Sequence, residues 1–99
     1  MHILDQYKNQ IQKLCENHNV KFLYAFGSVL TEKFNQKSDI DLVIEFKDIN
    51  VEEYADNYFN FKFSLQSLLN ARIDLLEDKA ITNPYFRKAL NQSRTLIYG

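Results

Sequence analysis

The sequence predicts an α+β protein, with a small β-sheet of about four strands and helices packed on one face, in a single domain over residues 1–99. Two patterns lead to this fold class. Apolar residues recur every three or four positions in two separate segments, which is typical of amphipathic helices. Short apolar runs rich in β-branched and aromatic residues lie between and after these segments, which is typical of strands. With 45% apolar residues, the chain has enough material for one core.

The first helix is predicted over about residues 3–17. Its apolar stripe consists of Ile3, Leu4, Tyr7, Ile11, Leu14 and Cys15. Cys15 is therefore expected to be a plain core thiol and not a nucleophile, because no His-Asp arrangement is evident around it. The polar run Asn17-His18-Asn19 ends this pattern, and residues 20–26 then read as the first strand.

The middle of the chain contains one short helix and one long helix. Residues 28–34 are predicted to form the short one, and residues 35–38 turn into a second strand that carries Asp39 and Asp41. Asn50 followed by Glu53 has the spacing of a capping box and predicts the start of the long helix. We expect Asn70-Ala71 to end it.

Three further elements are expected towards the C-terminus. Residues 72–77 read as the third strand. Asn83 with Pro84 after it predicts another helix start, since proline is favoured at the first helical position. Residues 94–98 read as a last short strand at an edge of the sheet.

Composition restricts the function classes. A formal net charge of −1 argues against an extended hold on a nucleic-acid backbone, which needs clustered Lys and Arg. The single cysteine excludes an internal disulfide and suits a reducing, cytoplasmic setting. No long apolar run or signal-peptide pattern occurs, so we expect neither membrane insertion nor export.

Asp39 and Asp41 form the first candidate site. Because side chains on a strand alternate between faces, these two carboxylates are expected on one side, with Ile40 and Leu42 pointing into the core. Two carboxylates about 4 Å apart repel by roughly 4 kcal/mol at the effective dielectric of a protein surface. Such a pair is costly unless a cation lies between its members, and Mg²⁺, which prefers oxygen ligands, is the natural candidate.

Gly27, Ser28 and Asp74 are the other candidate site residues. A glycine lets the backbone approach a phosphate closely, and a serine at a helix start adds a hydroxyl beside free amide groups. Each residue also has a plain structural alternative: Gly27-Ser28 as a turn after a strand, and the acids as turn or solvated strand residues. Their combined order along the chain favours a phosphate and metal site.

The order of these motifs resembles the nucleotidyltransferase superfamily of DNA polymerase beta. The shared pattern is an apolar strand that ends in Gly27-Ser28, then Asp39-Ile40-Asp41 on the next strand, and then Asp74 on a later strand. The similarity is greatest to the minimal nucleotidyltransferases, small bacterial proteins often encoded beside a HEPN-domain partner as toxin–antitoxin pairs. The tail, residues 83–87 and 96–98, also resembles theirs. This resemblance covers nearly the whole chain and implies a polymerase-beta-like mixed sheet.

The resemblance also implies roles for these residues. Gly27 and Ser28 would hold the β and γ phosphates of a nucleoside triphosphate, with ATP expected. Asp39, Asp41 and Asp74 would be the catalytic acids and the ligands of one or two Mg²⁺ ions, and Asp74 would also help to deprotonate the attacking hydroxyl. Nothing in the spacing ranks the other possible phosphate contacts, Lys33, Lys37, Arg72 and Arg87.

Two functions from different classes remain open. The first is an enzyme that transfers AMP from ATP to a HEPN-type partner protein, as the antitoxin of the pair. The second is a catalytically weak binding module that neutralises its partner by contact. The three acids favour the enzyme. Val29 and Leu30 favour the binding module, because many relatives have an Arg directly after Gly-Ser and a Gly soon after it.

The long helix carries more aromatic residues than one buried stripe accommodates, since positions 59, 61 and 63 cannot share a helical face. Surplus aromatic surface indicates an interface, either in a homodimer or with another chain. The alternatives are a helix covered on two sides and a helix that breaks near Asn60. Four other polar residues are expected to be ordinary solvated ones: Glu45, Asp78, His2 and His18.

Overall fold

The computed structural model describes residues 2–35 and 37–99, so Gln36 of the predicted turn and the side chain of His2 lie outside the described part. The elements, in chain order, are α1 (His2–Gln6), α2 (Lys8–Asn17), β1 (Val20–Phe26), the 3₁₀ helix η1 (Gly27–Leu30), β2 (Ile40–Phe46), α3 (Val51–Leu69), β3 (Ile73–Glu77), the 3₁₀ helix η2 (Asp78–Ala80), α4 (Pro84–Ser93) and β4 (Thr95–Tyr98).

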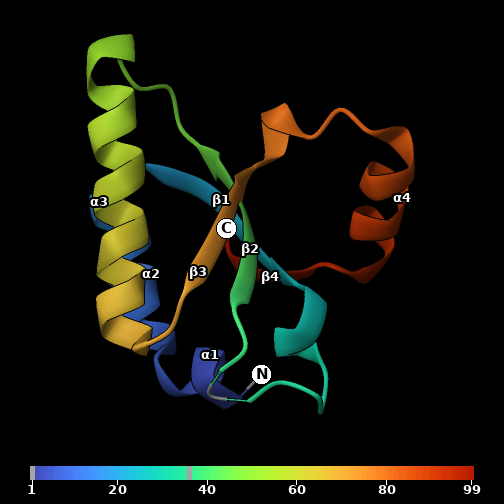
Figure 1. The fold of residues 1–99 in the computed structure, drawn as a ribbon. Helices are drawn as coiled ribbons and strands as arrows, with labels where there is room; N and C mark the ends of the chain where they lie inside the picture. The colour runs from blue at the N-terminus through green and yellow to red at the C-terminus, as the bar shows by residue number, and fades with distance from the viewer. Residues whose placement is uncertain (1, 36) are drawn as a thin grey trace.

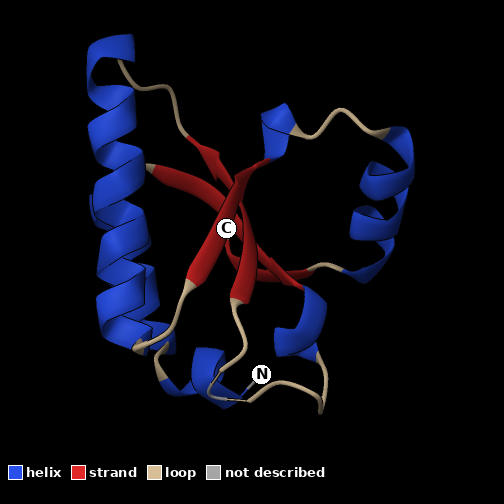
Figure 2. Ribbon diagram, in the orientation of Figure 1, coloured by secondary structure: helices blue, strands red, loops and turns tan. Residues whose placement is uncertain are grey.

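The four strands form one mixed sheet in the order β3-β2-β1-β4, which confirms the predicted fold class (Figure 2). β1 is antiparallel to both β2 and β4, whereas β2 and β3 are parallel. The parallel pair needs a crossover, and α3 provides it by returning the chain from the end of β2 to the start of β3. β2 therefore lies between β1 and β3, and β3 is an edge strand.

The core lies between the sheet and the helices α2 and α3, which Figure 1 shows on one side of the sheet. Strand alternation turns alternate side chains towards these helices. The fully buried residues on this side include Leu23, Ala25, Ile40, Leu42 and Ile44 of the strands and Ile11, Cys15, Phe61 and Leu65 of the helices. α4 lies on the other side in Figure 1, where Val43 and Leu90 are buried outside this core cluster.

The predicted N-terminal helix is divided in two at Tyr7, whose backbone leaves the helical region at φ −105° and ψ 21°. Main-chain bonds from Tyr7 N to Ile3 O (3.3 Å) and from Ile11 N to Tyr7 O (2.9 Å) bridge the division. Cys15 is fully buried, as predicted. Burial, with a smaller effect from the charge of Glu16, raises the pKa of its thiol to about 12, so the thiol stays protonated.

The sequence patterns that predicted helix ends were confirmed at some helices and not at others. η1 is shorter than the predicted helix because Thr31 is extended and both its N–H and its hydroxyl donate to Ser28 O. α3 begins after Asn50 as predicted, but no side-chain capping bond forms there, and Glu53 N–H donates to Asn50 main-chain O instead. Asn83 does cap α4, with its Oδ1 accepting from the N–H groups of Tyr85 and Phe86.

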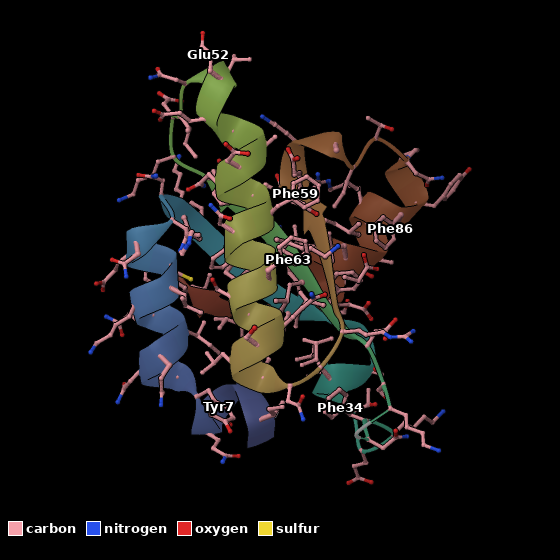
Figure 3. The ribbon with its side chains drawn as sticks, turned by 60° about the vertical axis from the view of Figure 1, so that its left-hand side comes forward. Tyr7, Phe34, Glu52, Phe59, Phe63 and Phe86 are labelled. Atoms are coloured by element: carbon pink, nitrogen blue, oxygen red, sulfur yellow. The ribbon has the colours of Figure 1, made fainter. Side chains whose placement is uncertain are left out.

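The surplus aromatic surface on α3 is confirmed. Phe61 is fully buried, whereas Phe59 and Phe63 are 48% and 55% exposed and stack on each other at 5.9 Å on the flank of α3 that faces β3 (Figure 3). α3 does not break near Asn60. His18 is not the solvated residue we expected, because its ring packs on Phe61 and Nδ1 lies 2.7 Å from Leu14 O.

Within the described residues, no helix has both the length and the apolar character that crossing a membrane requires.

Phe61→Ala is expected to destabilise the fold by about 3 to 5 kcal/mol, because it leaves a cavity in the fully buried core. The matched control is Phe63→Ala, two positions along the same helix, which should change the free energy of unfolding by less than about 1 kcal/mol. Urea unfolding of both variants measures the difference. Similar losses in the two variants would contradict this account of the core.

Candidate active site

Strand register brings Gly27, Asp41 and Asp74 to one place. In the antiparallel pair, Phe26 of β1 lies opposite Asp41, so Gly27 follows directly beside it. In the parallel pair, Asp74 of β3 is the register partner of Asp41. Paired residues point to the same face, and this is the face opposite Ile40 and Leu42.

Gly27 has a left-handed backbone, with φ +74°. A Cβ atom at this position would lie 2.5 Å from Asp41 Oδ2, closer than real Cβ atoms come to an oxygen. Only glycine therefore lets the end of β1 meet this carboxylate. Ser28 follows, half-buried, as the second residue of η1.

Asp41 is half-buried, and Asp39 and Asp74 are exposed. The pKa of Asp41 is raised above its usual value, first by burial, then by the charges of Asp74 and Asp39, and also by a hydrogen bond with Asp74. The residue with the larger effect on Asp41 is thus Asp74, from another strand. Asp39 lies one residue before the start of β2 and contributes the smaller charge effect.

The acids suit a magnesium ion that substrate phosphates help to hold. Among residues 2–35 and 37–99, no three His, Cys, Asp or Glu side chains form a ready-made metal site. Mg²⁺ is usually bound by one or two carboxylates together with substrate phosphates and water, so such a cage is not required. Burial first, and then repulsion by the charges of Asp74 and Asp39, raises the pKa of Asp41, and a divalent cation would offset that repulsion.

Side chains of α3 support β3, the edge strand that carries Asp74. The Tyr58 hydroxyl donates to Leu75 main-chain O, and Gln66 Oε1 accepts from Ile73 N–H at 3.4 Å. Burial and the charges of Glu77 and Asp74 raise the pKa of Tyr58, so it stays a donor. The sequence did not predict that α3 side chains bond the main chain of β3. Tyr54 and Tyr58 lie one helical turn apart and so on one side of α3, and this spacing could have indicated that their hydroxyl groups share a neighbour.

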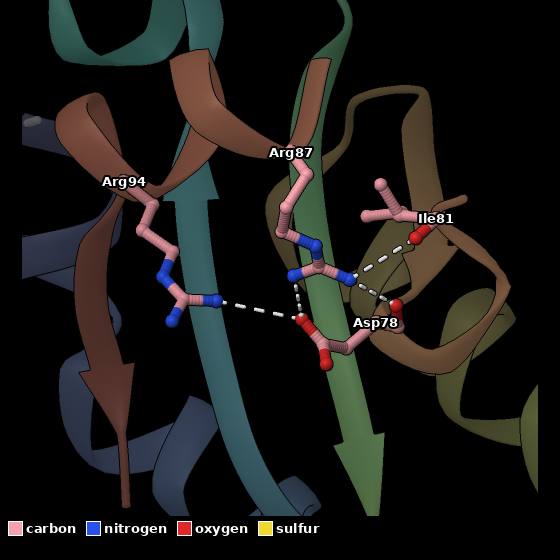
Figure 4. Close-up of polar contacts among 4 residues, drawn as sticks. All are labelled: Asp78, Ile81, Arg87 and Arg94. Carbon is pink, nitrogen blue, oxygen red and sulfur yellow. Dashed lines mark hydrogen bonds and ion pairs between the residues drawn. The ribbon is translucent and has the colours of Figure 1, made fainter. Parts of the chain in front are cut away.

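Asp78 is not the surface residue that the sequence predicted. Arg87 Nη1 donates to its Oδ1 at 2.7 Å, Arg94 Nη1 to the same oxygen at 3.4 Å, and Arg87 Nη2 to its main-chain O at 2.6 Å (Figure 4). The guanidinium of Arg94 also lies 4.0 Å from the centre of the Tyr24 ring. Arg87 is therefore engaged in holding α4 to the sheet and is a weaker candidate for phosphate than the exposed Lys33, Lys37 and Arg72.

Comparison with known proteins assigns the family and the fold. The family model described as "Polymerase beta, Nucleotidyltransferase" matches residues 9–99. The chain belongs to this family. It is therefore a nucleotidyltransferase. A relative from Methanocaldococcus jannaschii, provisionally named a protein adenylyltransferase, is 30% identical over 102 residues, which cover 99% of this chain and 99% of the relative.

Solved structures show the same fold. A protein provisionally described as a minimal nucleotidyltransferase superimposes with a TM-score of 0.76 at 23% identity, covering 93% of this chain and 90% of its own. A toxin–antitoxin complex with AMP-PNP gives a TM-score of 0.70 at 20% identity, covering 93% and 73%. A complex of a tri-AMPylated Shewanella oneidensis HEPN toxin with its MNT antitoxin gives 0.65 at 19% identity, covering 97% and 72%.

Gly27→Ala is expected to destabilise the fold by at least about 1 to 2 kcal/mol, the cost of a left-handed backbone at a residue with a side chain. It should also weaken nucleotide binding, because the new methyl group displaces the Asp41 carboxylate. Thermal unfolding with and without ATP and Mg²⁺ measures both effects. Ser28→Ala is the control for stability, and full nucleotide binding by the Gly27 variant would contradict the close approach.

Asp41→Asn is expected to stabilise the metal-free protein at pH 7. The pKa of Asp41 is higher in the folded protein than its usual value of 3.8. The native chain therefore loses stability as pH rises from 3.8 through the folded pKa of Asp41, whereas the variant has no carboxyl group there and does not. The gain should stay below about 1 kcal/mol, since solvent screens the partly open site. Thermal midpoints in a chelator at several pH values measure it, with Asp56→Asn on α3 as control. A lower midpoint for the Asp41 variant at pH 7 would refute this repulsion.

Proposed function

We propose that this chain is a magnesium-dependent adenylyltransferase that transfers AMP from ATP to a HEPN-type partner protein, as the antitoxin of a toxin–antitoxin pair. The observation that carries the proposal is the register of Asp41 with Asp74, with Gly27 in direct contact with Asp41. This arrangement supports the proposal, because carboxylate oxygens that could bind a metal, a glycine backbone that a phosphate could approach and the exposed Asp74 lie close together. A reducing, cytoplasmic setting fits the buried, protonated Cys15.

Each residue has a role in this reaction. Gly27 and Ser28 hold the β and γ phosphates through their backbone and the Ser28 hydroxyl. Asp39, Asp41 and Asp74 would hold Mg²⁺, which when bound would neutralise charge that develops around the α-phosphorus of ATP as AMP is transferred and pyrophosphate leaves. Asp74 lies exposed on the edge strand, where an acceptor hydroxyl has access, and accepts its proton.

Relatives support the donor and the acceptor. The Methanocaldococcus relative is named for protein adenylyltransfer, one structural neighbour was solved with AMP-PNP, and another with an AMPylated HEPN toxin. The exposed Phe59 and Phe63 beside β3 supply apolar area for a partner that brings its own hydroxyl to Asp74.

The second candidate is a binding module that neutralises its partner by contact. Val29 favours it, because this residue directly after Gly-Ser is only 1% exposed and serves the core. The phosphates consequently receive no help from a side chain at this position. The module would depend on exposed surfaces such as that of Phe59 and Phe63, and not on the acids.

Label transfer separates the two candidates. The native chain should move label from ATP labelled at the α-phosphate, and not at the γ-phosphate, to a HEPN protein in the presence of Mg²⁺. Asp41→Asn and Asp74→Asn should each reduce the rate at least about 100-fold, because each removes an acid at the reacting phosphate. Asp56→Asn, remote on α3, is the control.

Partner neutralisation by the same variants completes the test. If the Asp41 variant neutralises the toxin as well as the native chain does, the enzymatic proposal is wrong and the binding module replaces it. If neutralisation is lost together with label transfer while the variant stays folded and still binds the partner, transfer is the function.

A further inference from the structure

We propose that Phe86, on α4, is the stacking surface for the purine base of the donor nucleotide. This inference rests on the proposed function and adds to it a specificity-determining residue outside the acid site. Phe86 is 38% exposed although it is a large apolar side chain. Its ring meets that of Phe26 edge to face, with centroids 6.1 Å apart and planes at 68°. The two rings thus present an aromatic corner next to the acids.

The position of this corner follows from the strand register. Phe26 lies directly opposite Asp41, so the two side chains share a face with Cβ atoms about 5 Å apart. One further ring distance, 6.1 Å, leads to Phe86. Phe86 therefore lies one aromatic contact beyond the immediate neighbour of Asp41. From phosphates held at Gly27, the ribose of a nucleotide can carry its base to this ring.

The geometry of AMP transfer also favours the β1 side of the site for the donor base. In phosphoryl transfer the attacking and leaving oxygens lie roughly in line. The leaving pyrophosphate belongs at Gly27 and Ser28, at the end of β1, and the acceptor belongs at Asp74 on β3, across β2. The nucleoside leaves this line sideways, and Phe26 and Phe86, whose rings are in contact, lie at the β1 end of the line, where they can receive the base.

α4 is held rigidly enough to present this ring. Asn83 Oδ1 accepts from Phe86 N–H at 3.1 Å, which fixes the first turn of the helix. The next residue, Arg87, donates to Asp78 at the end of β3 (Figure 4). A ring fixed before binding loses little entropy when a base stacks on it, which favours affinity.

The base is recognised by its face and not by its edge. The polar side chains around the corner already have partners: Asn83 caps α4, and Arg87 and Arg94 share Asp78. Stacking is tolerant of base identity but increases with ring area. We therefore expect ATP and GTP to bind with similar affinity, and UTP to bind more weakly.

The experiment measures the affinity of native chain, Phe86→Ala and Phe86→Trp for three probes with Mg²⁺: ATP, UTP and inorganic tripolyphosphate. Phe86→Ala should weaken ATP binding by about 5- to 150-fold and remove the preference for ATP over UTP, leaving tripolyphosphate unchanged. Phe86→Trp should retain ATP affinity. Tyr85→Ala is the matched control, since Tyr85 is the neighbouring aromatic residue, 85% exposed, and should change nothing.

Other outcomes overturn the inference in separable ways. Unchanged ATP affinity in Phe86→Ala, with native transfer of AMP intact, removes the stacking role and leaves the proposed function standing. Parallel weakening of ATP and tripolyphosphate means that Phe86 serves only to place α4. Failure of the native chain to bind ATP or tripolyphosphate with Mg²⁺ overturns the proposed function together with this inference.

Discussion

Burial of the Asp41 carboxylate beside two other acids is the constraint around which this small fold is arranged. The central strand β2 holds Asp41 half-buried between Gly27 on one side and Asp74 on the other, and the raised pKa of Asp41 shows the cost. The same strand offsets that cost on its other face, where Ile40, Leu42 and Ile44 are almost completely buried. Because strand side chains alternate, one seven-residue strand supplies both the most costly charge and the centre of the core.

The edge position of β3 creates a second requirement. An acid that serves a protein acceptor has to be accessible, yet an exposed edge strand invites pairing with other chains. Tyr58 and Gln66 of α3 resolve this conflict by bonding main-chain groups of Leu75 and Ile73. Two main-chain groups of the edge strand are thus occupied, while the Asp74 side chain, on the strand face, stays exposed. The long crossover helix thus does more than connect β2 to β3, because its polar side chains protect the strand that bears the acid.

Local sequence patterns predicted most helices and strands. They did not predict contacts between residues that are far apart in the sequence. β1 was predicted with its observed bounds because the polar run Asn17-His18-Asn19 ends the helical pattern just before it, and in the structure Asn19 has a left-handed φ of 59° at that point. The sequence named Asp39, Asp41 and Asp74 as one set, but the larger effect of Asp74 on the pKa of Asp41 follows from the register of β2 with β3, which no single segment encodes. Asp78 was misjudged for the same reason: the arginines that hold it lie 9 and 16 residues away, on and after α4, and no local spacing connects them to it.

The two sides of the catalytic face have different mechanical support, and this difference fits their proposed partners. The donor side is rigid: Asp78 holds Arg87 and Arg94, and through them α4 and Phe86, against the sheet. A small nucleotide gives little interface area, so a surface fixed in advance is needed to bind it. The acceptor side, at β3, instead has the open aromatic pair Phe59 and Phe63. A protein acceptor brings enough area of its own to order such a surface, and an acceptor bound there could position its hydroxyl at Asp74.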